Sequence, residues 1–287
     1  MTRTADIRAL LEQRRGLIIP GCHDPLSARL VEAAGFQAAY LSGLAANAVM
    51  GLPDLGNMSL DSMVARTREI APAVDLPLFV DADDGFGGPT DAADSARRLE
   101  AAGAVGINID DTVLPRPAGA AKALVSVEIV QQKVAAARAA RVDARFLIIG
   151  RTDAMSTHGP EEALKRAAAL EEAGADALMV PYLTEAEQVR MFAASLKVPL
   201  FIAVTETARE SFSARDLAGA GHAATIYPVT ALLAGLGAQA RALAHLARAG
   251  DTQAIEATMM PIGQVRTLTT LRDGAVGSAP GRGGTPK

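Results

Sequence analysis

Tryptophan is absent from this sequence, aromatic residues make up only 3% of it, and Cys22 is its one cysteine. A lone cysteine excludes an internal disulfide and a zinc site built from cysteines. No segment approaches the roughly 20 consecutive apolar residues of a membrane-spanning helix. Residues 1–15 read as an amphipathic helix without the apolar run of a signal peptide. We therefore expect a cytoplasmic protein with a core of Ala, Leu, Val and Ile.

The sequence also lacks a large excess of basic or of acidic residues. The 287 residues include 28 basic and 32 acidic ones, for a net charge of −4, and no basic run is longer than Arg14-Arg15 or Arg97-Arg98. Nucleic-acid-binding domains normally carry a basic patch or stripe. We expect neither nucleic acid nor a membrane as a partner, and a small molecule as the ligand.

Eight short apolar runs recur along the chain, each followed by a turn rich in Gly, Pro or Asp and then by an Ala-rich segment of helical period. The predicted strands are 17–20, 39–42, 78–81, 105–109, 146–150, 177–180, 200–203 and 224–227, and the predicted helices between them include 89–102, 126–140, 160–173 and 213–220. Strands that are apolar on both faces and alternate with helices indicate a parallel sheet. Eight such units favour an α/β fold of the closed (β/α)8 TIM-barrel type, with an open doubly wound sheet as the alternative.

We predict one domain over residues 1–273. It includes two helices beyond the eighth strand, at 230–248 and 252–271. The tail, residues 274–287, is rich in Gly and Pro and is predicted to be flexible.

Polar residues gather at the carboxyl ends of the predicted strands, where barrel active sites lie. The third strand ends in Asp81-Ala82-Asp83-Asp84-Gly85 and the fourth is followed by Asp110. Crowded carboxylates raise each other's pKa, and a hard divalent cation relieves the repulsion. We predict a Mg²⁺ site at Asp81, Asp83 and Asp110, with Mn²⁺ as the next choice. The alternative is that Asp83 and Asp84 only shape a turn.

Arg151 directly follows an apolar strand and would be costly to bury unpaired. Its guanidinium could bind a substrate carboxylate or the charge of an enolate. The alternative is a structural salt bridge to Asp153, to Glu206 or to an acid of the cluster. Glu206, which follows the seventh strand, is also a candidate substrate-binding residue.

The second strand ends in Tyr40-Leu41-Ser42-Gly43-Leu44. Beside a cation and Arg151, the Tyr40 phenol could ionise more easily and accept a proton from a substrate hydroxyl. A half-buried barrel tyrosine is the alternative. The backbone at Ser42, Gly43 and Leu44 could donate to an anion, although a bare Ser-Gly is usually only a turn.

Six motifs together resemble the isocitrate lyase and phosphoenolpyruvate mutase superfamily. They are Tyr40-Leu41-Ser42-Gly43, the GLPDLG segment 51–56, Asp81-Ala82-Asp83 with Gly85-Phe86-Gly87, Asp110-Asp111, Arg151-Thr152-Asp153-Ala154 and Tyr227-Pro228-Val229-Thr230-Ala231. The likeness runs from about residue 16 to residue 248 and is closest to the methylisocitrate lyase branch.

The resemblance implies a modified barrel whose C-terminal helix swaps with a neighbouring subunit, in a tetramer that is a dimer of dimers. It implies Mg²⁺ near Asp81, Asp83 and Asp110. It also implies a 2-oxo or 2-hydroxy acid held by the metal, by Arg151 and by the backbone at Ser42 and Gly43. Asp54, within the GLPDLG segment, joins Tyr40 and Arg151 as a candidate catalytic residue.

The likeness breaks in the loop after the fourth strand. Lyases of this family carry Lys-Lys/Arg-Cys-Gly-His there, and the Cys protonates the departing carbanion, whereas residues 115–122 here read PRPAGAAK. Ala118 stands in place of the Cys and Ala120 in place of the His, and alanine cannot donate a proton. Asp110 replaces the usual Glu, and Tyr40 replaces the Trp of the mutase branch.

We therefore predict a Mg²⁺-dependent carbon–carbon lyase that acts on a small 2-hydroxy or 2-oxo di- or tricarboxylate through an enolate and releases pyruvate or a relative. The alternatives are an oxaloacetate-decarboxylase-type activity, a mutase or hydrolase of phosphonopyruvate, and a non-catalytic binder of 2-oxo acids. A Schiff-base aldolase is disfavoured because its one candidate amine, Lys122, lies in a predicted loop.

Overall fold

The computed structural model describes residues 3–183, 185–204, 206, 213, 214, 217 and 219–270. Eight strands pair in parallel and in chain order, and β8 pairs with β1 to close a barrel. The strands are β1 Leu17–Cys22, β2 Ala39–Leu41, β3 Leu78–Asp81, β4 Gly106–Ile109, β5 Leu147–Arg151, β6 Ala177–Met179, β7 Leu200–Ala203 and β8 Ala224–Tyr227. The predicted (β/α)8 barrel is confirmed, and every predicted strand overlaps an observed one.

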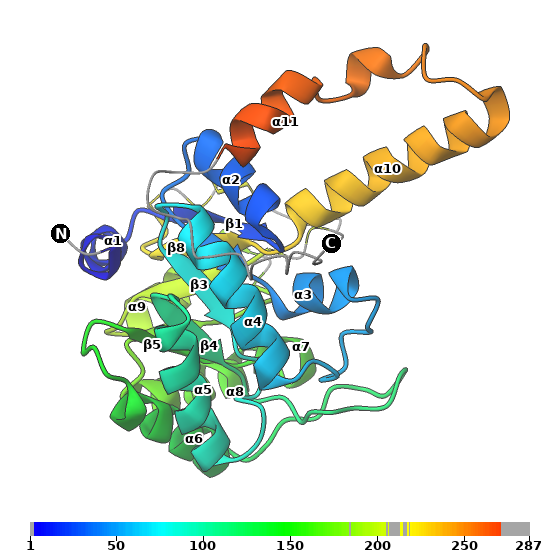
Figure 1. Cartoon of the computed structure of the whole chain (residues 1–287). Coiled ribbons are helices and arrows are strands. Elements are labelled where there is room, and N and C mark those ends of the chain that lie inside the picture. The colour runs from blue at the N-terminus through cyan, green and yellow to red at the C-terminus, as the bar shows by residue number, and fades with distance from the viewer. Residues whose placement is uncertain are drawn as a thin grey trace, which may run out of the picture. The chain divides into compact units, whose positions relative to one another are not determined.

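Helices surround the strands (Figure 1). They are α1 Arg3–Glu12, α2 Pro25–Ala33, α3 Gly43–Val49, α4 Leu60–Ile70, η1 Ala71–Ala73, α5 Pro89–Ala101, α6 Val127–Ala140, α7 Ala154–Thr157, α8 Pro160–Glu172 and α9 Ala186–Ser195. The helices predicted at 89–102, 126–140 and 160–173 are confirmed as α5, α6 and α8. The helix predicted at 213–220 falls mostly outside the described residues.

The chain divides into two compact units, Met1–Gln239 and Ala240–Lys287. Helix α10, Thr230–Ala249, begins in the first unit and ends in the second. The single helix predicted at 252–271 is wrong, because the structure has η2 Glu256–Thr258 and α11 Ile262–Thr269 there. Pro261, just before α11, lacks an N–H and its ring clashes with a preceding helical carbonyl, so one helix cannot run through it. One domain over residues 1–273 stays a prediction, and the tail 274–287 lies outside the described residues.

Alternation along the strands produces two apolar layers. Phe79 of β3 and Phe201 of β7 pack edge to face inside the barrel, with ring centroids 5.6 Å apart. Val80 lies between Phe79 and Asp81 on β3 and belongs to the layer that faces the helices. Because successive side chains point to opposite faces, Asp81 shares the inward side with Phe79. The barrel is therefore filled by apolar side chains below and carries its acids at the carboxyl end.

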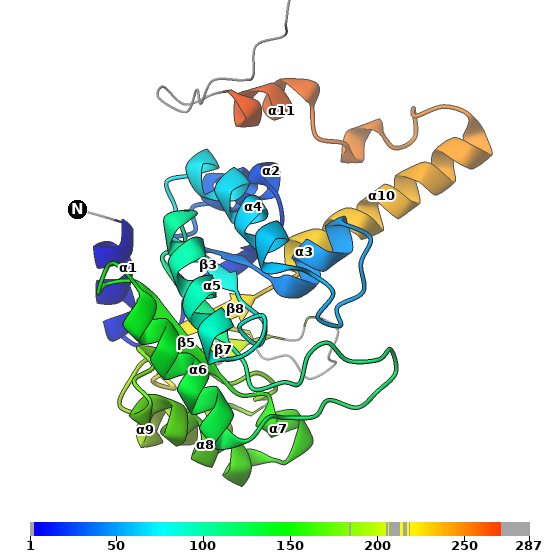
Figure 2. The ribbon, with the colours of Figure 1, turned by 60° about the horizontal axis from the view of Figure 1, so that its bottom comes forward.

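Residues 112–124, between β4 and α6, leave the barrel and return. An antiparallel bridge pairs Thr112 with Leu124, and the Val113 N–H donates to the Ala123 carbonyl at 2.8 Å. Figures 1 and 2 both show this segment extending away from the strands. It brings Leu114, Arg116 and Lys122 to the edge of the cavity described below.

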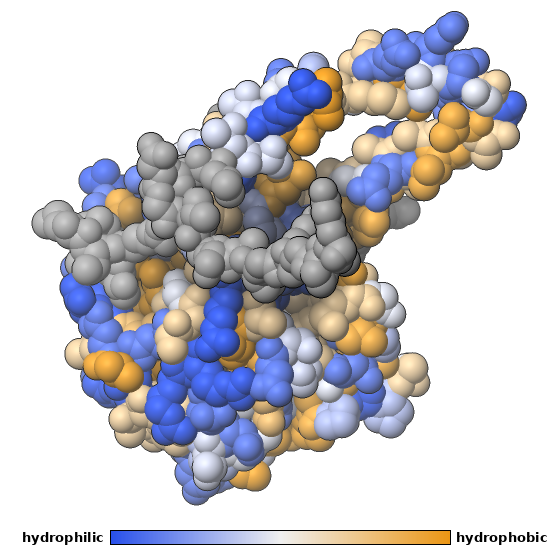
Figure 3. Space-filling model, viewed as in Figure 1, coloured by the Kyte–Doolittle hydropathy of each residue, from blue (hydrophilic) through white to orange (hydrophobic). Residues whose placement is uncertain are grey.

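Apolar side chains are exposed in the second unit. They gather on the end of α10 and on the segment that follows it (Figure 3). Leu243 is 65% exposed and Ile262 is 66% exposed, and Leu246, Met259 and Met260 are exposed as well. Among the described residues, no helix combines the length and the apolar composition needed to cross a membrane.

Candidate active site

A cavity of about 310 Å³ opens at the carboxyl ends of the strands. Its size suits a small ligand. Nine of the predicted site residues line it, namely Tyr40, Ser42, Leu44, Asp54, Asp81, Asp83, Asp110, Arg151 and Glu206. The structure therefore brings together residues that lie as much as 166 positions apart in the chain, since they run from Tyr40 to Glu206.

Gly43 is the predicted residue that does not line the cavity. Its backbone N–H donates to Asp81 Oδ2 at 3.1 Å, so this donor is already used and does not face a ligand as we predicted. A side chain at this position would have no room. An added Cβ would lie 2.6 Å from Asp83 Oδ1 and 3.2 Å from Asp81 Oδ2. Both carboxylates therefore meet over the bare backbone of Gly43.

Asp81 is held by donors from three directions. Its carboxylate accepts hydrogen bonds from the Gly43 N–H, from the Asp83 N–H at 3.2 Å and from Asn108 Nδ2 at 2.7 Å. These donors fix the carboxylate at the end of β3, and Asn108 reaches it from the neighbouring strand β4.

Asp83 and Asp110 have raised pKa values, as the predicted crowding requires. Burial raises the pKa of Asp83 well above its usual range, and the charges of Asp81, Asp110 and Asp54 add to this. Burial also raises the pKa of Asp110, to about 6, against the opposing charge of Arg151. Among the described residues, no donor is hydrogen-bonded to the Asp83 carboxylate. The cavity thus contains carboxylate charge that the protein compensates only in part.

These acids fit a hard cation that retains water ligands. Among the described residues, no three His, Cys, Asp or Glu side chains are gathered closely enough to bind a metal ion together. Mg²⁺ usually keeps several waters and is bound through only one or two carboxylates, so a complete protein cage is not required. The oxygen-only donors Asp81, Asp83 and Asp110 suit Mg²⁺ and do not suit zinc.

Arg151, at the end of β5, lies between the acids of three strand ends. Its Nε donates to Asp153 Oδ1 at 2.9 Å, and its guanidinium is 3.8 Å from Asp81 and 4.0 Å from Asp110. Burial alone would raise the pKa of Asp153, but the charges of Arg151 and Lys122 outweigh burial and lower it to about 2. The salt bridge to Asp153 that we gave as the alternative is present, while Arg151 still lines the cavity.

Asp111 anchors the end of β5 from below. It is fully buried and accepts hydrogen bonds from Thr152 Oγ1 at 2.7 Å and from the Asp153 N–H at 2.9 Å. Arg166 of α8 completes the arrangement, with Nη1 3.1 Å from Asp111 Oδ2. Asp111 therefore fixes the segment that positions Arg151 and Asp153.

Tyr40 is buried within β2. Its phenol donates to Asn108 Oδ1 at 2.8 Å. Burial and the charge of Asp81 raise the pKa of Tyr40 well above its usual range, and the opposing effect of Arg151 is smaller. Among the side chains present, burial and Asp81 outweigh Arg151. The easier ionisation that we expect beside a bound cation stays a prediction.

Three further acids have distinct surroundings. Asp54 is exposed at the rim of the cavity, where partial desolvation and the charge of Asp81 raise its pKa. Glu206 Oε1 accepts from the Val229 N–H at 2.8 Å and from Thr230 Oγ1 at 2.9 Å, at the start of α10. Asp84 accepts from the Phe86 N–H at 3.0 Å, within the turn that our alternative described, and it also pairs with buried Lys133 at 3.1 Å.

Sequence reasoning missed Tyr182 and considered Lys122 only as a disfavoured Schiff-base amine. The Lys122 ammonium forms an ion pair with Asp153 and donates to the Tyr182 phenol at 3.2 Å. Both side chains line the cavity. Ala118, in the same loop as Lys122, is exposed and does not line it. Tyr182 follows β6, 60 residues from Lys122, and no local pattern in the sequence connects them.

Comparisons with known proteins agree with this geometry. The family model for phosphoenolpyruvate phosphomutase matches residues 7–247. The chain is 39% identical to 2-methylisocitrate lyase from Aeropyrum pernix over 252 residues, which cover 87% of this chain and 81% of the relative.

Two solved structures are similar to the whole fold. Phosphonopyruvate hydrolase, in complex with oxalate and Mg²⁺, superposes with a TM-score of 0.85 at 32% identity, over 93% of this chain and 95% of the other. A 2,3-dimethylmalate lyase, a member of the phosphoenolpyruvate mutase and isocitrate lyase superfamily, superposes with a TM-score of 0.84 at 31% identity, with the same coverage. These relatives confirm the predicted enzyme class, a carbon–carbon lyase. The chain belongs to the phosphoenolpyruvate mutase family, within the superfamily that includes isocitrate lyase.

Proposed function

We propose that the protein is a Mg²⁺-dependent lyase that breaks a carbon–carbon bond of a small 2-hydroxy or 2-oxo carboxylate and releases pyruvate or a related 2-oxo acid. One observation carries this proposal: the partly compensated carboxylates of Asp81, Asp83 and Asp110 lie beside Arg151 in one small cavity. The lyase at 39% identity and the relative that binds oxalate and Mg²⁺ support the same chemistry.

Asp81, Asp83 and Asp110 would hold the cation. When bound, Mg²⁺ supplies positive charge that stabilises an oxyanion of the substrate. Three donors of the protein itself hold the Asp81 carboxylate in place. This pre-organisation is what a small ion needs, because it binds through few protein ligands.

Arg151 would bind the substrate carboxylate. Its Nε and Nη2 donate to Asp153, at 2.9 and 3.3 Å, while Nη1 is 3.8 Å from Asp81, beyond hydrogen-bonding distance. The remaining guanidinium hydrogens can therefore donate to a carboxylate in the cavity. Ser42, which lines the cavity and makes no capping bond to α3, offers a hydroxyl to the same cavity.

Asp54 is the better acceptor for a proton from the substrate hydroxyl. Tyr40 already donates to Asn108 and its pKa is raised, so it is a poor base. Asp54 lies at the rim, is accessible to solvent and can return the proton to water. A carboxylate whose pKa is raised is also a more effective base near neutral pH.

A substrate panel tests the proposed function. We expect a 2-oxo acid to be released from at least one 2-hydroxy or 2-oxo diacid in the presence of Mg²⁺ or Mn²⁺, and not by Asp81→Ala. Asp94→Ala, which changes an exposed acid of α5, is the matched control and should retain wild-type activity. Phosphate release or phosphoenolpyruvate formation from phosphonopyruvate, followed by phosphorus NMR, would instead assign the mutase or hydrolase reaction. Binding of oxalate without turnover of any compound would contradict a catalytic role.

The exposed apolar surface of the second unit also leads to a proposal. Leu243, Leu246 and Ile262 are apolar and largely exposed, and exposed apolar surface often marks an interface. A second copy of this chain is the proposed occupant, in a homo-oligomer. We expect Leu243→Glu to lower the molar mass in light scattering, whereas Val142→Glu, at an 85% exposed position of the first unit, should not. A monomeric wild-type protein would contradict this proposal.

A further inference from the structure

The cavity contains one phenol whose proton is uncommitted. The chain has three tyrosines. Tyr40 donates its hydrogen to Asn108, and Tyr227 does not line the cavity and accepts from the Ala214 N–H at 3.2 Å. Tyr182 lines the cavity, and its oxygen accepts from the Lys122 ammonium at 3.2 Å. An ammonium can only donate, and no acceptor for the Tyr182 hydrogen occurs among the described residues.

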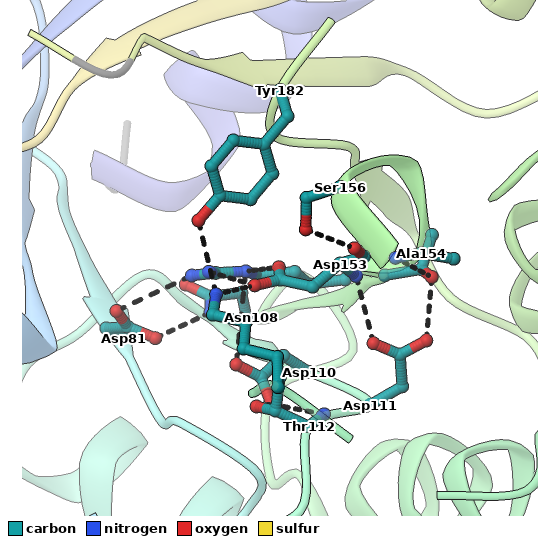
Figure 4. A network of polar contacts seen from close by, with 12 residues as sticks. Asp81, Asn108, Asp110, Asp111, Thr112, Asp153, Ala154, Ser156 and Tyr182 are labelled. Carbon is teal, nitrogen blue, oxygen red and sulfur yellow. Dashed lines mark hydrogen bonds and ion pairs between the residues drawn. The ribbon is translucent and has the colours of Figure 1, made fainter. Parts of the chain in front are cut away.

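A positively charged side chain lies beside the Tyr182 phenol. The Lys122 nitrogen lies 5.3 Å from the centre of the tyrosine ring and 3.2 Å from its oxygen, so the ammonium faces the atom that would carry the negative charge once the phenol gave up its hydrogen. Asp153, which is fully buried, forms an ion pair with Lys122 and fixes it there. Figure 4 shows the Tyr182 phenol pointing toward this network.

The backbone of Tyr182 supports a functional assignment. Its φ angle is +65°, in the left-handed region that costs a non-glycine residue about 1–2 kcal/mol. Residues held in such conformations cluster at functional sites. Glycine would relieve this cost but would provide no phenol. The one thiol of the chain is worse placed, because Cys22 is buried away from the cavity and burial raises its pKa to about 12.

We infer that Tyr182, paired with Lys122, is the catalytic acid that protonates the carbon released when the substrate bond breaks. The inference rests on the proposed lyase function. Cleavage leaves an electron pair on the departing carbon. The O–H bond of Tyr182 breaks and a C–H bond forms at that carbon, which leaves a phenolate beside the ammonium. Lys122 is 26% exposed, so water can return the proton to the pair.

Tyr182→Phe tests this role because it removes a single oxygen. We expect kcat to fall by about 10²–10⁴-fold, the usual contribution of a positioned acid. KM and the affinity for oxalate with Mg²⁺, measured by calorimetry, should change less than about threefold, since binding does not need the proton. Lys122→Met should also lower kcat, and Lys122→Arg should retain more activity because it keeps the charge. Tyr227→Phe, the matched control outside the cavity, should have wild-type kcat.

Two results separate this inference from the proposed function. If the wild-type protein releases no 2-oxo acid from any panel member, the proposed lyase function fails. If the wild-type protein is active and Tyr182→Phe has the same kcat within twofold, only the assignment of Tyr182 is overturned. Equal losses of kcat and of oxalate affinity in Tyr182→Phe would also overturn it, because they indicate a role in binding.

Discussion

The Tyr40 phenol donates a 2.8 Å hydrogen bond to the side-chain oxygen of Asn108. The amide nitrogen of Asn108 donates in turn to Asp81 at 2.7 Å. All three side chains are buried, and they come from the neighbouring strands β2, β4 and β3. Tyr40 therefore orients the Asp81 carboxylate through Asn108.

Tyr40→Phe should lower the stability of the protein more than its activity. The change leaves the buried Asn108 oxygen without its donor, which costs about 1–3 kcal/mol. We expect the free energy of unfolding, measured by urea denaturation, to fall by that amount. The value of kcat should fall by about tenfold or less, because Asp81 is reoriented but no proton acceptor is lost. A loss of 10³-fold or more would show that Tyr40 is a base after all.

Gly43→Ala should weaken metal binding. The added methyl group would lie 2.6 Å from Asp83 and 3.2 Å from Asp81, so both carboxylates must move. Overpacking of this kind costs about 1–3 kcal/mol, so the Mg²⁺ affinity measured by calorimetry should fall by about ten- to hundredfold. Gly235→Ala in α10 is the matched control, because nothing lies within 4 Å of its added Cβ. Unchanged affinity in Gly43→Ala would show that these carboxylates do not bind the ion.

His222 should make the protein less stable in mild acid. Burial lowers the pKa of His222 to about 4, and in the folded state its Nε2 contacts Thr225 Oγ1 at 2.9 Å. In unfolded chains histidine binds a proton below about pH 6.5. Between about pH 6.5 and pH 4 the unfolded state therefore binds more protons, and stability falls as the pH falls. The total loss from this residue is about 3 kcal/mol.

A comparison of two variants isolates this effect. The free energy of unfolding of His222→Gln should decrease less than that of the wild-type protein between pH 7 and pH 4.5. His158→Gln removes an exposed histidine and should keep the wild-type pH dependence. Parallel pH profiles for His222→Gln and the wild-type protein would contradict the assignment.

Asp111→Ala should be strongly destabilising. It leaves the guanidinium of Arg166, which is largely buried, without one partner and removes the acceptor of Thr152 and of the Asp153 N–H. Breaking a buried ion pair in this way costs about 3–5 kcal/mol. Asp94→Ala breaks exposed pairs with Arg97 and Arg98 and should cost less than about 1 kcal/mol. A difference of less than 1 kcal/mol between the two variants in urea denaturation would contradict the anchoring role.

Much of the fold could be predicted from the sequence because the repeating unit is long and regular. Strands such as Leu78–Asp81 and helices such as Pro89–Ala101 appear within a residue or two of their predicted bounds. The short helices Gly43–Val49 and Ala154–Thr157 were not predicted, because a helix of one or two turns is too short to show a helical period of apolar residues.

The site residues that follow the strands directly could be predicted, because the barrel topology brings the carboxyl ends of the strands together. Asp81, Asp83, Asp110 and Arg151 converge for this reason. The direction of the Tyr40 pKa was not predictable, because it depends on burial and on the relative distances of Asp81 and Arg151. Lys122 looked like a loop residue, and only the return of its loop brings it to Asp153 and Tyr182.

Metal dependence of 2-oxo acid release tests the central claim most directly. With an active panel substrate, release can be followed before EDTA is added, after it is added and after Mg²⁺ is restored in excess. We expect turnover to stop with EDTA and to return with Mg²⁺, and Asp81→Ala to remain inactive throughout, because Asp81, Asp83 and Asp110 need the ion to stabilise the reacting oxyanion. Turnover that continues unchanged in EDTA would contradict a Mg²⁺-dependent lyase.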